Sequence, residues 1–97
     1  MCKKNLWGVV FNPMPFYCYI LECSDGTFYT GWTTDPPRRE KQHNAGSGAR
    51  YTRVRRPVKM VYIEEQADKI TALKRELAIK HMSRDQKKGL IKDYGER

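Results

Sequence analysis

Two short runs rich in aromatic and β-branched residues follow each other early in the chain, FYCYILEC (residues 16–23) and TFYTGWTT (residues 27–34). Runs of this length and composition are typical of β-strands. The residues between them, Ser24-Asp25-Gly26, are of the types that form tight turns. The pattern therefore predicts a β-hairpin.

The length of the hairpin loop decides which side chains share a face of the sheet. A two-residue loop places Tyr19 and Tyr29 on opposite faces. A three-residue loop with a left-handed Gly26 places them on the same face, and it pairs Tyr19 with Gly31 and Leu21 with Tyr29. The Ser-Asp-Gly order suits a type I turn followed by a left-handed glycine, so we expect the second register.

The next segment, TDPPRREKQHNAG (residues 34–46), has the start and stop signals of a short helix. Asp35 suits the N-cap, Pro36 the first helical position and Gly46 the stop. Arg39 and His43 are four residues apart and should share one face of this helix.

The C-terminal half predicts one strand and two helices. VKMVYIEE (residues 58–65) alternates as a third strand does, and ADKITALKRELAIKHM (67–82) has a helical period. We expect this helix to face the core with a stripe made of Ile70, Leu73 and Leu77, and Glu76 to lie at the edge of the core. Ser83 is expected to cap a final helix over about residues 84–92.

Composition and charge indicate a polyanionic partner. The chain has 97 residues, enough for one domain, and a net charge of +8. Residues 38–59 hold eight Lys or Arg and a single acidic residue. Such a run is either a solvated surface or a phosphate-binding one, and the mixture with glycine and tyrosine favours phosphate binding.

Part of this basic run, GSGARYTRVRRP (residues 46–57), has no hydrophobic period and is predicted as a loop, with at most a helical turn. Its arginines suit backbone phosphates, and Tyr51 suits stacking on an unpaired base. The alternative is a mobile, solvated connector.

The N-terminal segment and the cysteines predict a cytoplasmic protein with no membrane partner. The apolar run LWGVVF (residues 6–11) is shorter than a signal-peptide core or a membrane span. Cys2, Cys18 and Cys23 form no C-x-x-C spacing, which indicates reduced thiols.

The combination of YCY on one strand, YTG on the next and RREKQHNAG on the following helix resembles the GIY-YIG nuclease superfamily. The whole pattern is most similar to its small single-domain bacterial branch of unassigned function. The resemblance implies an α/β (α+β) fold, a small three-stranded antiparallel sheet flanked by helices in the order β-β-α-β-α-α. It covers residues 14–97 as one domain and leaves residues 1–13 as an N-terminal extension.

The resemblance also implies roles for individual residues. Tyr19, Tyr29, Arg39 and His43 would be catalytic, and Glu76 would bind a single divalent ion, Mg²⁺ or Mn²⁺, weakly without substrate. Gly31 would have a structural role. The partner would be DNA, in branched or single-stranded form, and its expected contacts are Arg38, Lys41, Arg50, Tyr51, Arg53, Arg55 and Arg56.

These residue types suit the hydrolysis of a phosphodiester. Arg39 offers a planar fork that matches phosphate oxygens, and a metal on Glu76 would stabilise developing charge. Tyr29 would accept a proton from water and Tyr19 would orient that water, while His43 would share the proton transfer or bind a phosphate when charged. Each residue also has a simpler interpretation: the tyrosines as packing residues, His43 and Arg39 as helix surface, and Glu76 as the ion-pair partner of Lys80.

The sequence therefore predicts a metal-dependent DNA endonuclease that selects structure rather than sequence. The alternative is a catalytically weak or inactive nucleic-acid-binding module on the same scaffold. A third hypothesis is a domain that docks onto a partner protein through LWGVVF.

Overall fold

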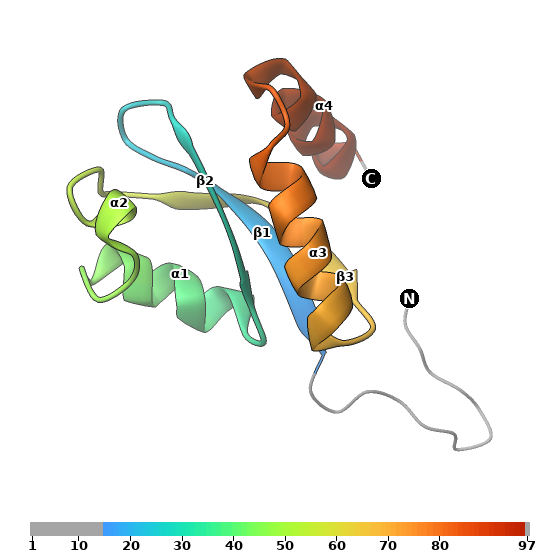
Figure 1. Cartoon of the computed structure of the whole chain (residues 1–97). Coiled ribbons are helices and arrows are strands. Elements are labelled where there is room, and N and C mark those ends of the chain that lie inside the picture. The colour runs from blue at the N-terminus through green and yellow to red at the C-terminus, as the bar shows by residue number, and fades with distance from the viewer. Residues whose placement is uncertain (1–14, 97) are drawn as a thin grey trace.

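The computed structural model describes residues 15–96, which form a three-stranded antiparallel sheet with four helices (Figure 1). The strand order is β2-β1-β3, so β2 is an outer strand. The α+β fold predicted from the sequence is confirmed, with one added short helix, α2. The elements are β1 (Phe16–Glu22), β2 (Phe28–Thr33), α1 (Pro36–Asn44), α2 (Arg50–Arg53), β3 (Lys59–Gln66), α3 (Lys69–Lys80) and α4 (Arg84–Gly95).

The hairpin between β1 and β2 has the predicted three-residue loop. Tyr19 lies opposite Gly31 and Leu21 opposite Tyr29. Gly26 has a φ of 85°, and its amide donates to the Cys23 carbonyl at 2.9 Å. Since residues two apart on a strand point to the same face, this register places both tyrosines on one side of the sheet.

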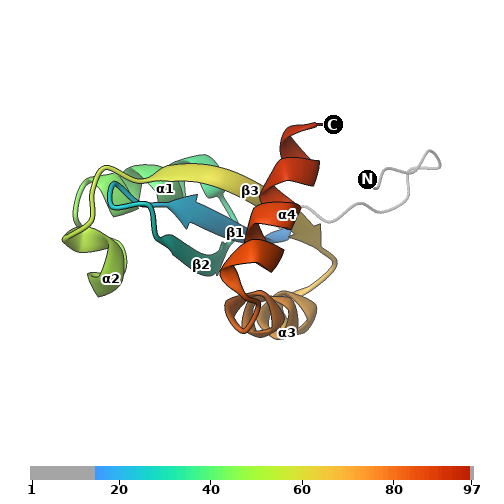
Figure 2. The ribbon, with the colours of Figure 1, turned by 90° about the horizontal axis from the view of Figure 1, so that it is seen from above.

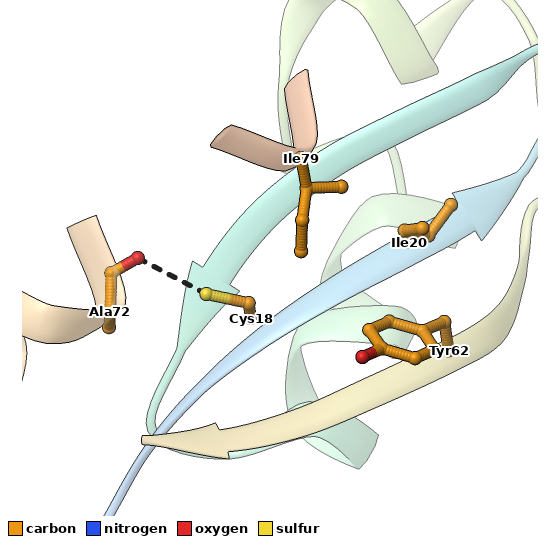
Figure 3. Packing of buried hydrophobic residues seen from close by; sticks show 5 residues of the cluster. All are labelled: Cys18, Ile20, Tyr62, Ala72 and Ile79. Carbon is orange, nitrogen blue, oxygen red and sulfur yellow. Dashed lines mark hydrogen bonds between the residues drawn. The ribbon is translucent and has the colours of Figure 1, made fainter. Parts of the chain in front are cut away.

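The alternation along β1 divides the core in two. Cys18 and Ile20 face α3 and α4, and the Cys18 thiol donates to the Ala72 carbonyl at 3.1 Å (Figure 3). Tyr19 and Leu21 belong to a second buried cluster, on the side of the sheet that α1 covers. Figure 2 shows α1 and α3 on opposite sides of the sheet.

The predicted core face of α3 is wrong. Ile70, Leu73 and Leu77 are 66%, 41% and 55% exposed, whereas Ala72 and Ile79 are fully buried. At about 100° per residue, the buried face of the helix is turned by roughly 140° from the predicted one. A small residue at position 72 lets the helix approach Cys18 closely, which the larger side chains of the expected stripe would prevent.

Side-chain hydrogen bonds fix α1 and the ends of the helices. Asp35 accepts from the Arg38 amide at 3.2 Å, as predicted for an N-cap, and Gly46 has a φ of 87° just past the end of α1. The Asn44 side chain bonds both the amide and the carbonyl of Val58, at 2.7 and 2.9 Å. These two bonds anchor α1 to the segment that leads into β3.

The C-terminal helix begins as predicted and runs further. Ser83 and Gln86 form a capping box, and α4 extends to Gly95 instead of ending near residue 92. Within residues 15–96, no helix has the length and apolar character needed to cross a bilayer. The predicted N-terminal extension, with LWGVVF, lies outside the described residues.

Candidate active site

Four of the five side chains predicted for catalysis and metal binding meet on the α1 side of the sheet. The Tyr19 hydroxyl lies 2.8 Å from His43 Nε2, and Arg39 Nε donates to the same hydroxyl at 3.4 Å. The centre of the Tyr29 ring lies 5.4 Å from the centre of the His43 ring and 6.5 Å from that of the Tyr19 ring. The hairpin register and the i,i+4 spacing on α1 together produce this convergence.

Gly31 makes room for the Tyr19 side chain. A Cβ at position 31 would lie 2.6 Å from the Tyr19 hydroxyl oxygen, closer than any unbonded contact allows. The phenol therefore reaches across the outer strand β2 only because residue 31 has no side chain.

Gly31→Ala is expected to reduce the free energy of unfolding by about 1–3 kcal/mol, because the new methyl group displaces a buried phenol held by His43 and Arg39. Urea denaturation measures this loss. Gly89→Ala is the matched control: Gly89 lies within α4 with open space around it, so alanine there should leave stability unchanged or raise it by up to about 1 kcal/mol. Equal stability of Gly31→Ala and wild type would contradict the close contact.

His43 is fully buried, and both of its ring nitrogens have partners. Nε2 faces Tyr19, and Nδ1 lies 2.8 Å from the Thr52 hydroxyl oxygen. Burial, together with the Arg39 charge, lowers the pKa of His43 to about 4. His43 is therefore neutral at pH 7 and inaccessible to a phosphate, which rules out the phosphate-binding role among its predicted alternatives.

Tyr19 is also a buried group with a shifted pKa. Burial raises the pKa of Tyr19 to about 12, the Arg39 hydrogen bond opposes that rise, and the Tyr29 and Glu76 charges add to it. Tyr19 is therefore a neutral phenol at pH 7.

Glu76 reaches this region from the opposite side of the sheet. It lies on α3, which packs against β1 and β2, and its side chain is 16% exposed. Its carboxylate pairs with Lys80 at 3.6 Å, as the simpler interpretation predicts. Lys80 in turn lines a cavity of about 260 Å³ with Tyr29, at the outer strand β2. Lys80 thus connects Glu76, its ion-pair partner, with the cavity that Tyr29 lines.

Arg39 borders a second hollow at the other end of β2. Its Nη1 donates to Gln42 Oε1 at 3.0 Å, so the guanidinium is held on the surface of α1. The hollow has a volume of about 340 Å³ and is lined by Trp32, Thr33, Thr34, Arg38, Arg39 and Gln42.

The residues predicted to contact DNA divide into two groups. Arg38 and Lys41 on α1 and Arg50 and Arg53 on α2 are exposed. The remaining three make contacts within the protein around α2. Arg55 pairs with Asp25 at 3.1 Å, and Arg56 donates to two main-chain carbonyls. The centre of the Tyr51 ring lies 3.8 Å from the Arg55 guanidinium carbon and 6.0 Å from the centre of the Tyr29 ring. Because Arg55 covers one face of the Tyr51 ring, a base can stack on that face only if Arg55 moves.

A sequence profile described as the GIY-YIG catalytic domain matches residues 15–89. This match covers most of the chain. The chain belongs to the GIY-YIG family.

Close relatives of this GIY-YIG domain carry the family name UPF0213. One from Syntrophus aciditrophicus is 54% identical over a match that covers 84% of this chain and 94% of the relative. One from Halobacterium salinarum is 53% identical over a match that covers 77% of this chain and 97% of the relative. Two solution structures are similar. A UPF0213 protein from Bacillus halodurans has 47% sequence identity and a TM-score of 0.53, and the match covers 81% of this chain and 84% of that one. A protein from E. faecalis has 43% sequence identity and a TM-score of 0.59, and the match covers 89% of this chain and 92% of that one. None of these names states a reaction.

GIY-YIG nucleases generally depend on a divalent metal. Residues 15–96 contain no cluster of three or more His, Cys, Asp or Glu side chains that could hold one. Glu76 is the predicted ligand, and one carboxylate fits a hard divalent cation whose other ligands are water and substrate phosphate. The residues present therefore fit a weakly bound ion that needs the substrate to complete its site.

Two residues that shape this site have no recognisable signal in the sequence. Thr52 is fully buried and contacts His43. Gly48 lies so close to His43 that a Cβ there would be 2.4 Å from Nδ1. Both lie in residues 46–57, whose composition predicts a basic loop, and only the folded chain shows that this segment packs against α1.

Proposed function

We propose that this GIY-YIG domain hydrolyses phosphodiester bonds in DNA with one divalent metal ion, Mg²⁺ or Mn²⁺. The strongest support is the position of the Tyr19 hydroxyl, which hydrogen-bonds to His43 and Arg39. The Tyr19 side chain can reach this position because Gly31, which it passes closely, has no side chain. A packing tyrosine needs neither an arginine nor an imidazole on its hydroxyl. This arrangement lies on a GIY-YIG scaffold, whose family acts on DNA.

Each residue has a proposed role that follows from its position. Arg39, half-buried beside an open hollow, binds the phosphate oxygens through charge-assisted hydrogen bonds. Tyr19 stays a neutral phenol and orients the attacking water. Tyr29 lines the cavity at β2 and, in its deprotonated form, accepts the proton of that water. Glu76 would hold the metal ion, which would supply charge stabilisation to the reacting phosphodiester.

The exposed arginines and Lys41 favour contact with backbone phosphates rather than with base edges. Arg38 and Lys41 lie on α1, which borders the same hollow as Arg39, and Arg50 and Arg53 lie on α2. We therefore propose that the domain selects DNA by structure and acts on branched or single-stranded forms. The free thiols of Cys18 and Cys23, both buried, fit the proposed cytoplasmic location.

The test is a nicking assay on branched, single-stranded and duplex DNA with Mg²⁺, Mn²⁺ or EDTA. Cleavage is expected with either metal, fastest on branched or single-stranded DNA, and none with EDTA. Cleavage that persists in EDTA would contradict the metal requirement.

One observation favours the second candidate function, a binding module that no longer cleaves. The Glu76 carboxylate already pairs with Lys80, which competes with a metal ion for the same oxygens. Under this alternative the domain binds DNA in a salt-dependent way, cleaves none of the three substrates, and is unaffected by loss of the Glu76 carboxylate.

A further inference from the structure

Thr52 contacts two groups that determine where its hydroxyl proton lies. Its Oγ1 is 2.9 Å from the Ala49 carbonyl oxygen and 2.8 Å from His43 Nδ1. Two oxygens at that distance repel each other unless a proton lies between them, and a carbonyl has none to offer. Thr52 therefore donates its single proton to Ala49 and must accept from His43. Nδ1 carries the hydrogen.

The other nitrogen of His43 then has a defined state. A neutral imidazole carries one N–H only, and burial together with Arg39 lowers the pKa of His43 to about 4, which keeps the ring neutral at pH 7. With the hydrogen on Nδ1, Nε2 is a bare acceptor. The Tyr19 hydroxyl, 2.8 Å away, must donate to it.

We infer that Thr52 is a positioning residue that fixes the tautomer of His43 and thereby turns the lone pairs of the Tyr19 oxygen toward the active site. With its proton directed at His43, that oxygen accepts from Arg39 Nε and has acceptor capacity left for a further donor such as the O–H of a water. In the opposite tautomer, Nε2–H would donate to Tyr19, and the phenol would turn its proton toward the site. The effect on catalysis rests on the proposed function, whereas the tautomer is a property of the folded protein.

The fold builds this chain of contacts from three separate elements. Tyr19 comes from β1, His43 from α1 and Thr52 from α2, and all three are fully or almost fully buried. Gly48 lets the connecting segment lie against the imidazole, because a larger residue would collide with Nδ1. The glycines and arginines of this segment suggested a flexible phosphate-binding loop, yet its middle part packs Thr52 against His43.

The test reads the tautomer directly from the ¹⁵N NMR signals of the two ring nitrogens, in the full chain at pH 7. The chain has two histidines, and the exposed His81 serves as an internal reference. In wild type, His43 should show a protonated Nδ1 and an unprotonated Nε2. A wild-type spectrum with the proton on Nε2 would overturn the inference, whatever the variants do.

Two variants separate the role of the hydroxyl from that of packing. Thr52→Ser keeps the hydroxyl and should keep the wild-type pattern at His43. Thr52→Val keeps the shape and removes the oxygen, so Nδ1–H loses its acceptor and the Nε2–H form should appear. An unchanged His43 pattern in a folded Thr52→Val would contradict the role of Thr52.

The consequence for the reaction has its own readout. Thr52→Val should lower kcat for DNA cleavage about tenfold with little change in KM, because Thr52 acts on the site only by orienting His43 and Tyr19. Thr52→Ser should keep the wild-type kcat. A wild-type protein with the expected tautomer and no cleavage would refute the proposed function and leave the tautomer assignment intact.

Discussion

Replacing Arg39 with lysine is expected to slow DNA nicking by about a hundredfold without unfolding the domain. Lysine keeps the positive charge but lacks the planar fork that binds two phosphate oxygens at once. It also lacks the Nε–H that donates to Tyr19 at 3.4 Å and the Nη1 that holds the guanidinium on Gln42. The measurement is the single-turnover rate of nicking with Mg²⁺.

Arg38→Lys is the matched control for this variant. Arg38 is the preceding residue on α1, it is exposed, and it lies outside the group of side chains around Tyr19. Its replacement should change the rate less than about threefold, because an exposed phosphate contact tolerates a point charge. If both variants slow nicking equally, Arg39 acts only as part of the basic surface.

Acidification from pH 7 to pH 4 is expected to remove about 3 kcal/mol from the free energy of unfolding through His43 alone. Burial lowers the pKa of this imidazole from 6.5 to about 4 in the folded state, so the unfolded chain binds the proton more readily between these values. Stability is therefore fully present above about pH 6.5 and is lost as the pH falls toward 4. Urea denaturation at several pH values measures the loss.

His43→Gln provides the comparison, since a glutamine does not titrate in this range. The variant will be less stable at pH 7, but its free energy of unfolding should lack the steep fall between pH 6.5 and pH 4. Asp25 and Asp68 have pKa values lowered by hydrogen bonds from Thr27 and Thr71, and their contributions are lost only at lower pH. Parallel pH profiles of wild type and His43→Gln would show that His43 is not held neutral.

The sequence predicted the hairpin well because local chemistry decides it. The Ser-Asp-Gly loop has one favourable geometry, and that geometry alone sets Tyr19 opposite Gly31. The helix signals around Asp35 and Ser83 are local in the same way. Arg39 and His43 share a face because they are four residues apart on one helix. These rules need no knowledge of distant contacts.

The face of α3 could not be predicted from its apolar pattern. Leucine and isoleucine outnumber alanine as core residues, and the periodicity of the large side chains pointed to Leu73 and Leu77. The fold instead brings α3 close to β1 at Ala72, which is fully buried and whose carbonyl accepts from Cys18. The distance between two packed elements is a tertiary property.

The contacts behind the proposed catalytic side chains could not be predicted for the same reason. Thr52 and Gly48 lie in a segment with no period, and nothing local indicates that it folds back on α1. The same segment uses Arg55 to cover the Tyr51 ring, so a side chain that suggested base stacking has an intramolecular partner. Charge and aromatic content alone cannot separate a bracing arginine from one that meets DNA.

The central claim is that Glu76, from the far side of the sheet, joins Tyr19, Tyr29 and Arg39 in one metal-dependent site around the edge of β2. The most direct test compares single-turnover nicking of branched DNA by wild type and Glu76→Gln with Mg²⁺, with Glu96→Gln as an exposed control. We expect cleavage by wild type and Glu96→Gln, and none by Glu76→Gln, which should still bind the DNA. Cleavage by Glu76→Gln at the wild-type rate would contradict the account.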